Sequence, residues 1–352
     1  MYYLNENVKN LNRIFDQNKR EGYLRLDLNE NPVGLPEEFI KKVLSSVTPE
    51  FISQYPETLE FTETLAKYLN TDIQHINLVN GSSEGIRNII EAYTSEGGKI
   101  VGVTPSYAMF EVYSKMYGRN FCPVEYTEDC KMPLDRILNA MTEEVQLLII
   151  VNPNNPMGDT ISYKDMDKIV AKAKEKEITI LIDEAYIYFY PNTFIKYAME
   201  NDHIFVTRTF SKLFSLAGLR LGYVVGWPDG IEKIQKLCTP HNVNAFGMKF
   251  AKAIIEEPEL IDKLIEQYKG GKQYIVKELE KSNYTFNAKE GNFMFIKPKT
   301  DAKTLVGRMK NEKKILIKIY NGIGNMGTCL RVSIGNKDVM KRFFDALVEL
   351  DK

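Results

Sequence analysis

Two kinds of segment alternate along the first two thirds of the chain. Short, mostly apolar runs occupy residues 99–103, 145–151, 178–182, 203–207 and 221–225. Amphipathic segments lie between most of them, with apolar residues at spacings of three and four, as in 163–176. Strands that are apolar on both faces and separated by such helices predict a mostly parallel sheet covered on both sides.

The pattern changes towards the end of the chain. Other helices are expected at 37–47, 59–69, 86–93 and 108–117, and helical segments run from 228 to 281 with breaks at 239–241 and 257–258. Beyond residue 284 the order is strand 291–296, helix 302–311, strands 315–319 and 329–334, and helix 339–350. This order suits a smaller α+β domain. We expect an N-terminal arm with a small-domain contribution at 1–45, a large domain at 46–260 and a C-terminal domain at 261–352.

Composition narrows the class of protein. The 352 residues are 44% hydrophobic and 26% charged, with a formal net charge of -1. We therefore expect neither nucleic acid nor a membrane surface as partner. The four cysteines and three histidines are scattered without metal-ligand spacing, so no metal site and no disulfide framework are expected. No apolar run approaches the roughly 20 residues of a membrane span. A cytoplasmic protein is the expectation.

Polar clusters follow the ends of the predicted strands. They are Gly81-Ser82-Ser83, Ser106-Tyr107, Asn154-Asn155, Asp183 with Tyr186, and the segment from Thr209 to Lys212. Ligands of open α/β sheets bind beyond the carboxyl ends of the strands. Five clusters at five such ends predict one shared site.

Lys212 is the candidate centre of that site. Large apolar neighbours would desolvate its ammonium group, lower the pKa and expose a nucleophilic amine. Hydroxyls at Thr209 and Ser211, with the guanidinium of Arg220, could hold a phosphate. A lysine with a phosphate grip is what pyridoxal 5'-phosphate (PLP) requires: a Schiff base and an anion anchor. The alternative, an ordinary surface lysine, leaves the other strand-end clusters unexplained.

Four further side chains suit the same cofactor. Asp183 could keep the pyridine nitrogen protonated, although an aspartate after a strand is also a common helix cap. Asn155 and Tyr186 could donate to the phenolic oxygen, and Tyr107 could stack on the ring. We expect Lys212, Asp183 and Tyr186 to be the catalytic groups.

The remaining candidates have a structural alternative each. Ser82 and Ser83 open a helix and could present backbone N–H groups to the phosphate, or serve as a routine N-cap. Asn29 and Asn31 lie in a loop broken by prolines and could line the site or cap the loop. Arg331 could bind a substrate carboxylate through two hydrogen bonds, or form a structural salt bridge.

Together these motifs resemble those of the class I/II aminotransferases of PLP fold type I, with the histidinol-phosphate aminotransferases as the most similar branch. The segments that carry the resemblance are 28–32, 154–158, 183–186, 209–212 and 218–223. The resemblance implies an α/β fold in which a large domain has a mostly parallel seven-stranded sheet between helices, beside a smaller α+β domain. It also implies a homodimer in which Tyr55 reaches the neighbouring subunit's PLP phosphate, and it implies that Asn292 and Arg331 face the substrate.

Departures from the family's pattern bear on the substrate. Met157 replaces a usual threonine, Ser83 a usual aspartate, and Lys318 an arginine that commonly helps hold a substrate phosphate. The arm also lacks a Pro-Tyr pair at residues 12–13. Because lysine keeps the charge but loses the bidentate fork, the amino acceptor is left open.

Several functions remain open at this stage. The main hypothesis is transfer of an amino group between L-glutamate, or a similar donor, and a small phosphorylated keto substrate, either imidazole-acetol phosphate or a three-carbon keto phosphate. Decarboxylation of phosphoserine or phosphothreonine is the alternative reaction. A binding protein without catalysis is a third hypothesis, against which Lys212, Asp183 and Arg220 together argue.

Overall fold

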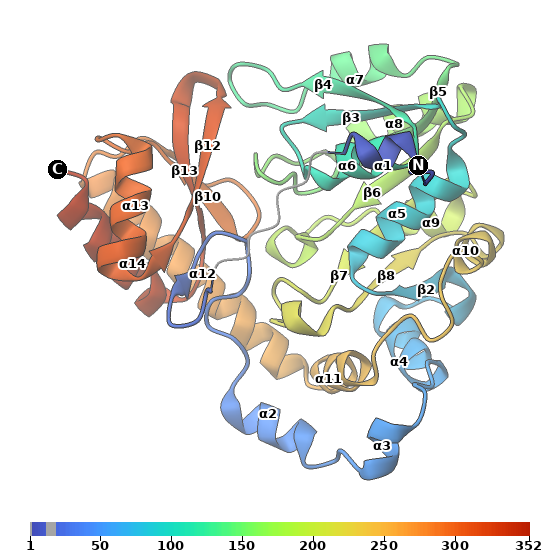
Figure 1. Ribbon diagram of the computed structural model, residues 1–352, viewed down its shortest axis with the longest axis horizontal. Helices are drawn as coiled ribbons and strands as arrows, with labels where there is room; N and C mark the ends of the chain where they lie inside the picture. Colours follow the sequence, from blue (N-terminus) through green and yellow to red (C-terminus); the bar gives the residue numbers. More distant parts are fainter. Residues whose placement is uncertain (1, 12–18) are drawn as a thin grey trace.

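The structure, a computed structural model, describes residues 2–11 and 19–352. Two sheets lie side by side, and the larger carries most of the helices (Figure 1). The helix α12 (Pro258–Lys281) runs obliquely between the two parts, and the expected boundary at 260/261 falls in its first turn. The stretch at which the arm lacks Pro-Tyr lies outside the described residues.

The larger sheet has seven strands in the order β2-β8-β7-β6-β5-β3-β4. The strands are β2 (Ile76–Val79), β3 (Lys99–Thr104), β4 (Asn120–Glu125), β5 (Val145–Val151), β6 (Thr179–Asp183), β7 (Ile204–Thr209) and β8 (Gly222–Val225). Strand β8 is antiparallel to both neighbours, and the pairs among β3 to β7 are parallel. The predicted mostly parallel seven-stranded sheet is confirmed.

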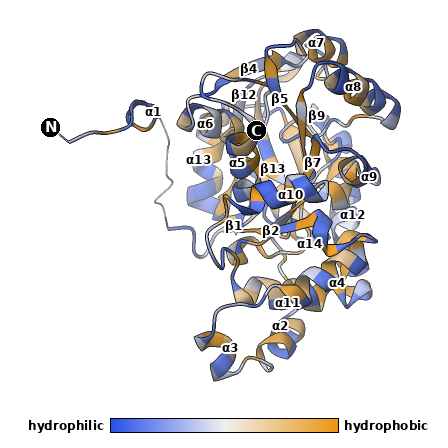
Figure 2. Cartoon of the chain, turned by 90° about the vertical axis from the view of Figure 1, so that its right-hand side faces the viewer, coloured by the Kyte–Doolittle hydropathy of each residue, from blue (hydrophilic) through white to orange (hydrophobic). Residues whose placement is uncertain are grey.

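Both faces of this sheet are buried. In β5, Leu147 and Ile149 pack with one apolar cluster, whereas Leu148 and Ile150 pack with the other. This alternation explains why the strand is apolar at nearly every position. Helices that contribute to the clusters include α5 (Ser82–Tyr93), α6 (Met109–Met116) and α10 (Pro228–Gln235) on one side and α4 (Leu59–Leu69), α8 (Tyr163–Glu175) and α9 (Ile195–Glu200) on the other. Figure 2 shows the apolar strands between the mixed helices.

The smaller sheet is antiparallel, in the order β12-β13-β10-β9. Its strands are β9 (Phe286–Asn287), β10 (Phe293–Ile296), β12 (Lys318–Ile323) and β13 (Gly327–Ser333). Two helices complete this part, α13 (Ala302–Lys313) and α14 (Lys337–Leu350), and α14 packs on α12.

The N-terminal segment connects both parts. Its two-residue strand β1 (Leu24–Arg25) pairs in parallel with β11 (Ile315–Leu316) of the C-terminal part. The other helices are α1 (Glu6–Lys9), α2 (Glu37–Leu44), α3 (Pro49–Ser53), α7 (Leu134–Ala140) and α11 (Ala245–Ile255). Residues 26–36 thus pass between the smaller sheet and the strand ends of the larger sheet.

Three local predictions were wrong or incomplete. The strand expected at 315–319 is two strands, because β11 pairs with the N-terminal segment and β12 with β13. The helix expected from residue 86 begins at Ser82, and Gly81 is its N-cap with φ 73°, so neither serine caps it. Strand β4 and helix α7 were not predicted, since Pro123 and mixed polarity obscure their patterns.

Membrane-spanning helices and metal-binding clusters are both absent from the residues that the structure describes. No helix there is both long and apolar enough to cross a membrane. Across the same ranges, no group of three or more His, Cys, Asp and Glu side chains could hold a metal ion.

Candidate active site

Lys212 follows the end of β7 and points back at the N-terminal segment. Its Nζ donates to the carbonyl of Leu28 at 3.2 Å and lies 5.6 Å from the ring centroid of Tyr186. Burial, with a smaller contribution from the guanidinium of Arg331, lowers the pKa of Lys212 to about 8. A neutral, nucleophilic amine is therefore accessible close to physiological pH.

Asp183 ends β6, directly beside Thr207 in β7. Its Oδ1 accepts hydrogen bonds from Thr207 Oγ1 at 3.1 Å and from the backbone N–H of Ala185 at 3.2 Å. Desolvation raises its pKa to about 6, against the effect of both hydrogen bonds. Both hydrogen bonds are made to Oδ1, so Oδ2 is left for a cationic N–H partner. Such a partner would favour the ionised form of the carboxyl group.

A buried ion pair holds the turn that carries Asp183 and Tyr186. Glu184 accepts from Arg208 Nη2 at 2.7 Å and from the backbone N–H of Phe194 at 2.6 Å, and its side chain is fully buried. Removing one partner would leave an uncompensated buried charge, which costs roughly 3–5 kcal/mol. The pair therefore anchors the turn after β6.

An anion cradle forms where the N-terminus of α5 meets Arg220. Arg220 Nη1 donates to Ser211 Oγ at 3.3 Å, and Thr209 Oγ1 donates to the same oxygen at 2.9 Å. A Cβ on Gly81 would lie 2.6 Å from Arg220 Nη2, so only glycine lets the guanidinium lie against this turn. Because no side chain caps α5, its first N–H groups, including that of Ser82, remain for an anion.

Ser83 and Tyr107 contact each other above this cradle. Their hydroxyl oxygens are 3.2 Å apart, and burial raises the pKa of Tyr107. The contact joins α5 to the loop after β3, which fixes the tyrosine ring at the strand ends.

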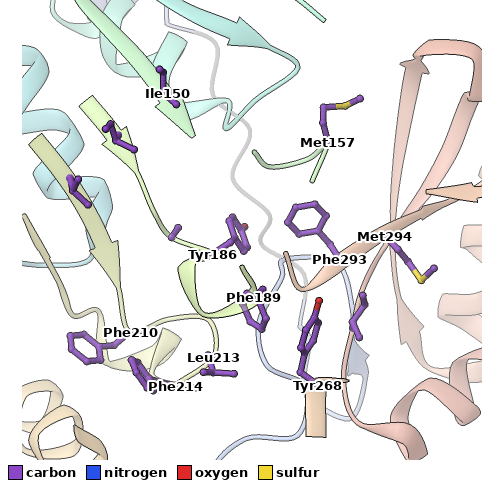
Figure 3. Packing of buried hydrophobic residues seen from close by; sticks show 14 of the residues in the cluster. Ile150, Met157, Tyr186, Phe189, Phe210, Leu213, Phe214, Tyr268, Phe293 and Met294 are labelled. Carbon is purple, nitrogen blue, oxygen red and sulfur yellow. The ribbon is translucent and has the colours of Figure 1, made fainter. Parts of the chain in front are cut away.

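Asn29 of the N-terminal segment bridges Asn155 and Tyr186. Asn29 Nδ2 donates to Tyr186 Oη at 2.9 Å and to Asn155 Oδ1 at 3.4 Å. The Tyr186 ring lies next to Phe293 of the smaller sheet (Figure 3), and the two rings pack edge-on with centroids 5.1 Å apart. The site is therefore assembled from both sheets.

Arg331 is 4% exposed yet has no carboxylate within ion-pair distance among the described residues. Its Nη1 donates to Asn155 Oδ1 at 3.1 Å and to Tyr320 Oη at 3.0 Å, and its Nη2 donates to the carbonyl of Asp27 at 2.5 Å. Its Nε has no partner. A buried cation held by neutral oxygens alone is suited to an incoming carboxylate, so a structural salt bridge is not what the geometry shows.

Lys318 lies directly across from Arg331 in the β12–β13 pair, so both point to one face of the smaller sheet. Tyr320 lies between them, with its ring centroid 5.4 Å from Lys318 Nζ and 5.1 Å from Arg331 Cζ. Lys318 is exposed and forms no ion pair in the part of the chain that the structure describes. Two cations thus lie in line on the face that bears the site.

Of three other predicted residues, Asn31 and Asn292 lie next to the site and Tyr55 lies away from it. Asn31 donates to the carbonyl of Leu213 at 3.2 Å, next to Lys212. Asn292 is buried and donates to the Asn29 carbonyl at 3.0 Å. Tyr55 is not brought to Lys212: it is 78% exposed and stacks on His241 with centroids 4.3 Å apart.

Sequence reasoning missed Thr207, Tyr320 and Ser333. Thr207 bonds Asp183 only because β6 and β7 pair in that register, which the sequence does not encode locally. Tyr320 is two residues from Lys318, and the two-residue period of a strand would have placed both on one face. Ser333 Oγ accepts from the backbone N–H of Asn29 at 2.9 Å, a contact between residues 304 positions apart that no local pattern signals.

These residues fit PLP. The amine of Lys212, the carboxylate of Asp183 and the cradle around Arg220 could supply an attachment point, a partner for a ring N–H and an anion anchor. Arg331 is buried and Arg220 is exposed, and neither guanidinium has a carboxylate partner among the described residues, so the two could bind two anions, a substrate carboxylate and a phosphate. The fold and site define a PLP-dependent enzyme of fold type I.

Comparison with known proteins narrows the class. The family model for aminotransferase class I and II matches residues 21–347. Relatives include the histidinol-phosphate aminotransferases of Caldanaerobacter subterraneus subsp. tengcongensis, 28% identical over 99% of this chain and 98% of that protein, and of Thermoanaerobacter sp. strain X514, 30% identical over 93% and 92%. The chain therefore belongs to the class I and II aminotransferases, and it is a PLP-dependent transaminase whose substrates are an amino donor and a keto acceptor.

Solved structures agree on the fold. The histidinol-phosphate aminotransferase of Sinorhizobium meliloti, in complex with pyridoxal-5'-phosphate, superposes with a TM-score of 0.83 at 22% identity, over 93% of this chain and 90% of that one. The L-threonine-O-3-phosphate decarboxylase of Porphyromonas gingivalis has a TM-score of 0.76 at 19% identity, over 93% and 98%. The fold is therefore shared by enzymes that catalyse different reactions.

Proposed function

We propose that the protein moves an amino group between L-glutamate, or a similar donor, and a small phosphorylated keto compound. The observation that carries this proposal is the pair of cations on one face of the smaller sheet: Arg331, which has no carboxylate partner within residues 2–11 and 19–352, and Lys318 beyond Tyr320. Arg331 would bind the donor's carboxylate, and Lys318 would attract the phosphate of the acceptor. The names of the relatives support an acceptor of the imidazole-acetol phosphate type, and a three-carbon keto phosphate carries the same anion.

The chain's own groups have distinct roles in this reaction. When bound, PLP supplies a carbonyl carbon for the substrate amine and a ring that accepts electrons. Lys212 would hold it through Nζ and, as a neutral amine, move the proton at the substrate's Cα. Asp183 would keep a proton on the ring nitrogen, Asn155 and Tyr186 would donate to the phenolic oxygen, and Tyr107 would cover the ring.

The cradle would take the cofactor phosphate. Its parts are the first turn of α5 at Ser82 and Ser83, and the side chains of Thr209, Ser211 and Arg220. Placing the phosphate at this helix end uses the positive end of the helix dipole.

We also propose a homodimer that completes the site. Four large, exposed apolar side chains lie within residues 44–59: Leu44 at the end of α2, Ile52 in α3, Tyr55 in the loop after α3 and Leu59 at the start of α4. Ile52 is 67% exposed, which is unfavourable for a surface left in water. Tyr55, held by stacking on His241, would reach the phosphate bound by the second copy. Four free cysteines suit the reducing cytoplasm, which we propose as its location.

A half-reaction screen tests the proposed substrates. The PLP-loaded protein is mixed with L-glutamate, histidinol phosphate, a three-carbon amino phosphate and the unphosphorylated form of each amine, and the visible absorption is followed. Loss of the cofactor's visible band with glutamate and with one phosphorylated amine, but not with its unphosphorylated form, is the expected result.

Two controls make the screen decisive. Lys212→Ala should abolish every conversion, whereas Lys249→Ala, a lysine on α11, should not. Equal rates with phosphorylated and unphosphorylated amines would refute a phosphate subsite. Release of carbon dioxide from phosphoserine or phosphothreonine, without amino transfer, would favour the decarboxylase instead.

A further inference from the structure

Asn29 is held from two sides by the smaller sheet. It is 1% exposed and has φ 57°, a left-handed conformation that few residues other than glycine adopt. Its backbone N–H donates to Ser333 Oγ at 2.9 Å, and its carbonyl accepts from Asn292 Nδ2 at 3.0 Å. These contacts aim its side chain at the strand ends of the larger sheet.

A chain of donors and acceptors fixes which way each group points. Arg331 can only donate, so the Asn155 atom that it contacts at 3.1 Å is the carbonyl oxygen, Oδ1. The Asn29 atom that faces this oxygen must then be the donor, Nδ2, and Ser333 Oγ lies 3.4 Å from Asn29 Oδ1 on the other side. A flipped Asn29 amide would place two acceptors against each other.

The same amide sets the direction of the Tyr186 hydroxyl. Asn29 Nδ2 donates to Tyr186 Oη at 2.9 Å, which makes that oxygen the acceptor. A hydroxyl has one proton to donate, so the proton of Tyr186 is left for another partner. Because Asn155 Oδ1 accepts from Arg331, the Nδ2 group of the same amide is directed away from Arg331.

We propose that Asn29 is a positioning residue that aims the Tyr186 hydroxyl proton and the Asn155 amide at the phenolic oxygen of bound PLP. The inference rests on the proposed roles of Tyr186 and Asn155. It gives Asn29 the role of orienting these two donors, in place of direct contact with the substrate. Two donors fixed in advance stabilise the ionised phenolic oxygen, because no reorientation is needed when the cofactor binds. The charged and titratable groups that face Tyr186 are Lys212, Arg331, Asp183 and Tyr107.

Two substitutions separate this role from a structural one. In Asn29→Asp the carboxylate can only accept, so the Tyr186 proton would turn towards residue 29 and away from the cofactor. In Asn29→Gly the left-handed backbone and its bonds to Ser333 and Asn292 can remain, and only the side-chain donor is lost. Asn70→Gly is the matched control, since Asn70 has φ 54° and lies exposed at the end of α4.

The experiment is a pH titration of the visible absorption of the PLP-loaded protein without substrate. Asn29→Asp should raise the midpoint of this pH titration by about one pH unit. A shift of that size corresponds to the free energy of roughly one charge-assisted hydrogen bond. Asn29→Gly should raise it less, and Asn70→Gly should leave it unchanged. With Tyr186→Phe as background, Asn29→Asp should add little further shift.

Unchanged midpoints in both Asn29 variants would overturn the proposal, even if their thermal stability fell, because a purely structural residue would change only stability. If Asn29→Asp fails to fold by circular dichroism, the Asn29→Gly midpoint decides alone. Because no substrate is added, a wrong substrate assignment cannot produce either result, and the screen described above tests that assignment separately.

Discussion

Arg331 Nη1 lies 3.1 Å from Asn155 Oδ1, so an arginine of the smaller sheet contacts an amide at a strand end of the larger sheet. The two residues are 176 positions apart in the chain. A substrate carboxylate at Arg331 would therefore be bound next to a donor for the cofactor.

Asp183→Asn should change how the stability of the cofactor-free protein depends on pH. Burial raises the pKa of Asp183 from 3.8 to about 6, so between these values the folded chain binds the proton more tightly than the unfolded chain. The free energy of unfolding therefore falls by up to about 3 kcal/mol as pH rises through this window. Asparagine has no such proton and can still accept from Thr207 and Ala185.

Urea denaturation of both proteins at pH 4.5 and pH 7 measures this effect. The variant should gain stability relative to the parent protein between the two pH values. An identical difference at both values would show that the carboxylate of Asp183 does not titrate in this window.

Arg220→Met should weaken binding of pyridoxal phosphate without affecting pyridoxal. In the proposed site the guanidinium would donate to the phosphate, and one charge-assisted hydrogen bond is worth roughly 1.5–3 kcal/mol, about 10- to 100-fold in Kd. Fluorescence titration of the cofactor-free protein with both compounds provides the measurement. Equal weakening for the two would place the phosphate away from Arg220.

Arg331→Lys should raise KM for the carboxylate donor by roughly 10- to 100-fold, because lysine lacks the fork that binds both oxygens. Steady-state kinetics with glutamate measure the change. The matched control is Arg308→Lys, at a surface arginine paired with Glu312 at 2.8 Å, which should behave like the parent enzyme. A KM equal to that of the parent enzyme would assign the donor's carboxylate to another group.

Tyr320→Phe should affect donor binding more than the chemical step. Its hydroxyl accepts from Arg331 Nη1 at 3.0 Å, whereas its ring packs on Phe295 with centroids 5.5 Å apart, a contact that phenylalanine retains. Losing the acceptor should raise KM for glutamate by about 5-fold, roughly 1 kcal/mol, with kcat and thermal stability nearly unchanged. A fall in kcat at constant KM would mean that Tyr320 acts on the reaction itself.

The mostly parallel sheet and its strand-end residues could be predicted because both depend on local patterns. Strands apolar on both faces, such as 145–151 and 178–182, must be covered twice, and polar residues can only follow where such strands end. Lys212, Asp183 and Asn155 were predicted as site residues in this way. The split of residues 315–319 into two strands could not be predicted, because β11 and β12 pair with different strands and such pairing depends on the tertiary structure.

The sequence by itself therefore determined the fold class and the cofactor, and it supplied Lys212 as the candidate lysine, because hydrophobic period and residue chemistry act over a few positions. Only the tertiary structure decided which groups share a hydrogen bond. Thr207 reaches Asp183 through strand register, and Ser333 reaches Asn29 across 304 residues. Hydrogen bonds require partners within about 3.5 Å, and packing of the two sheets against the N-terminal segment is what sets distances on that scale.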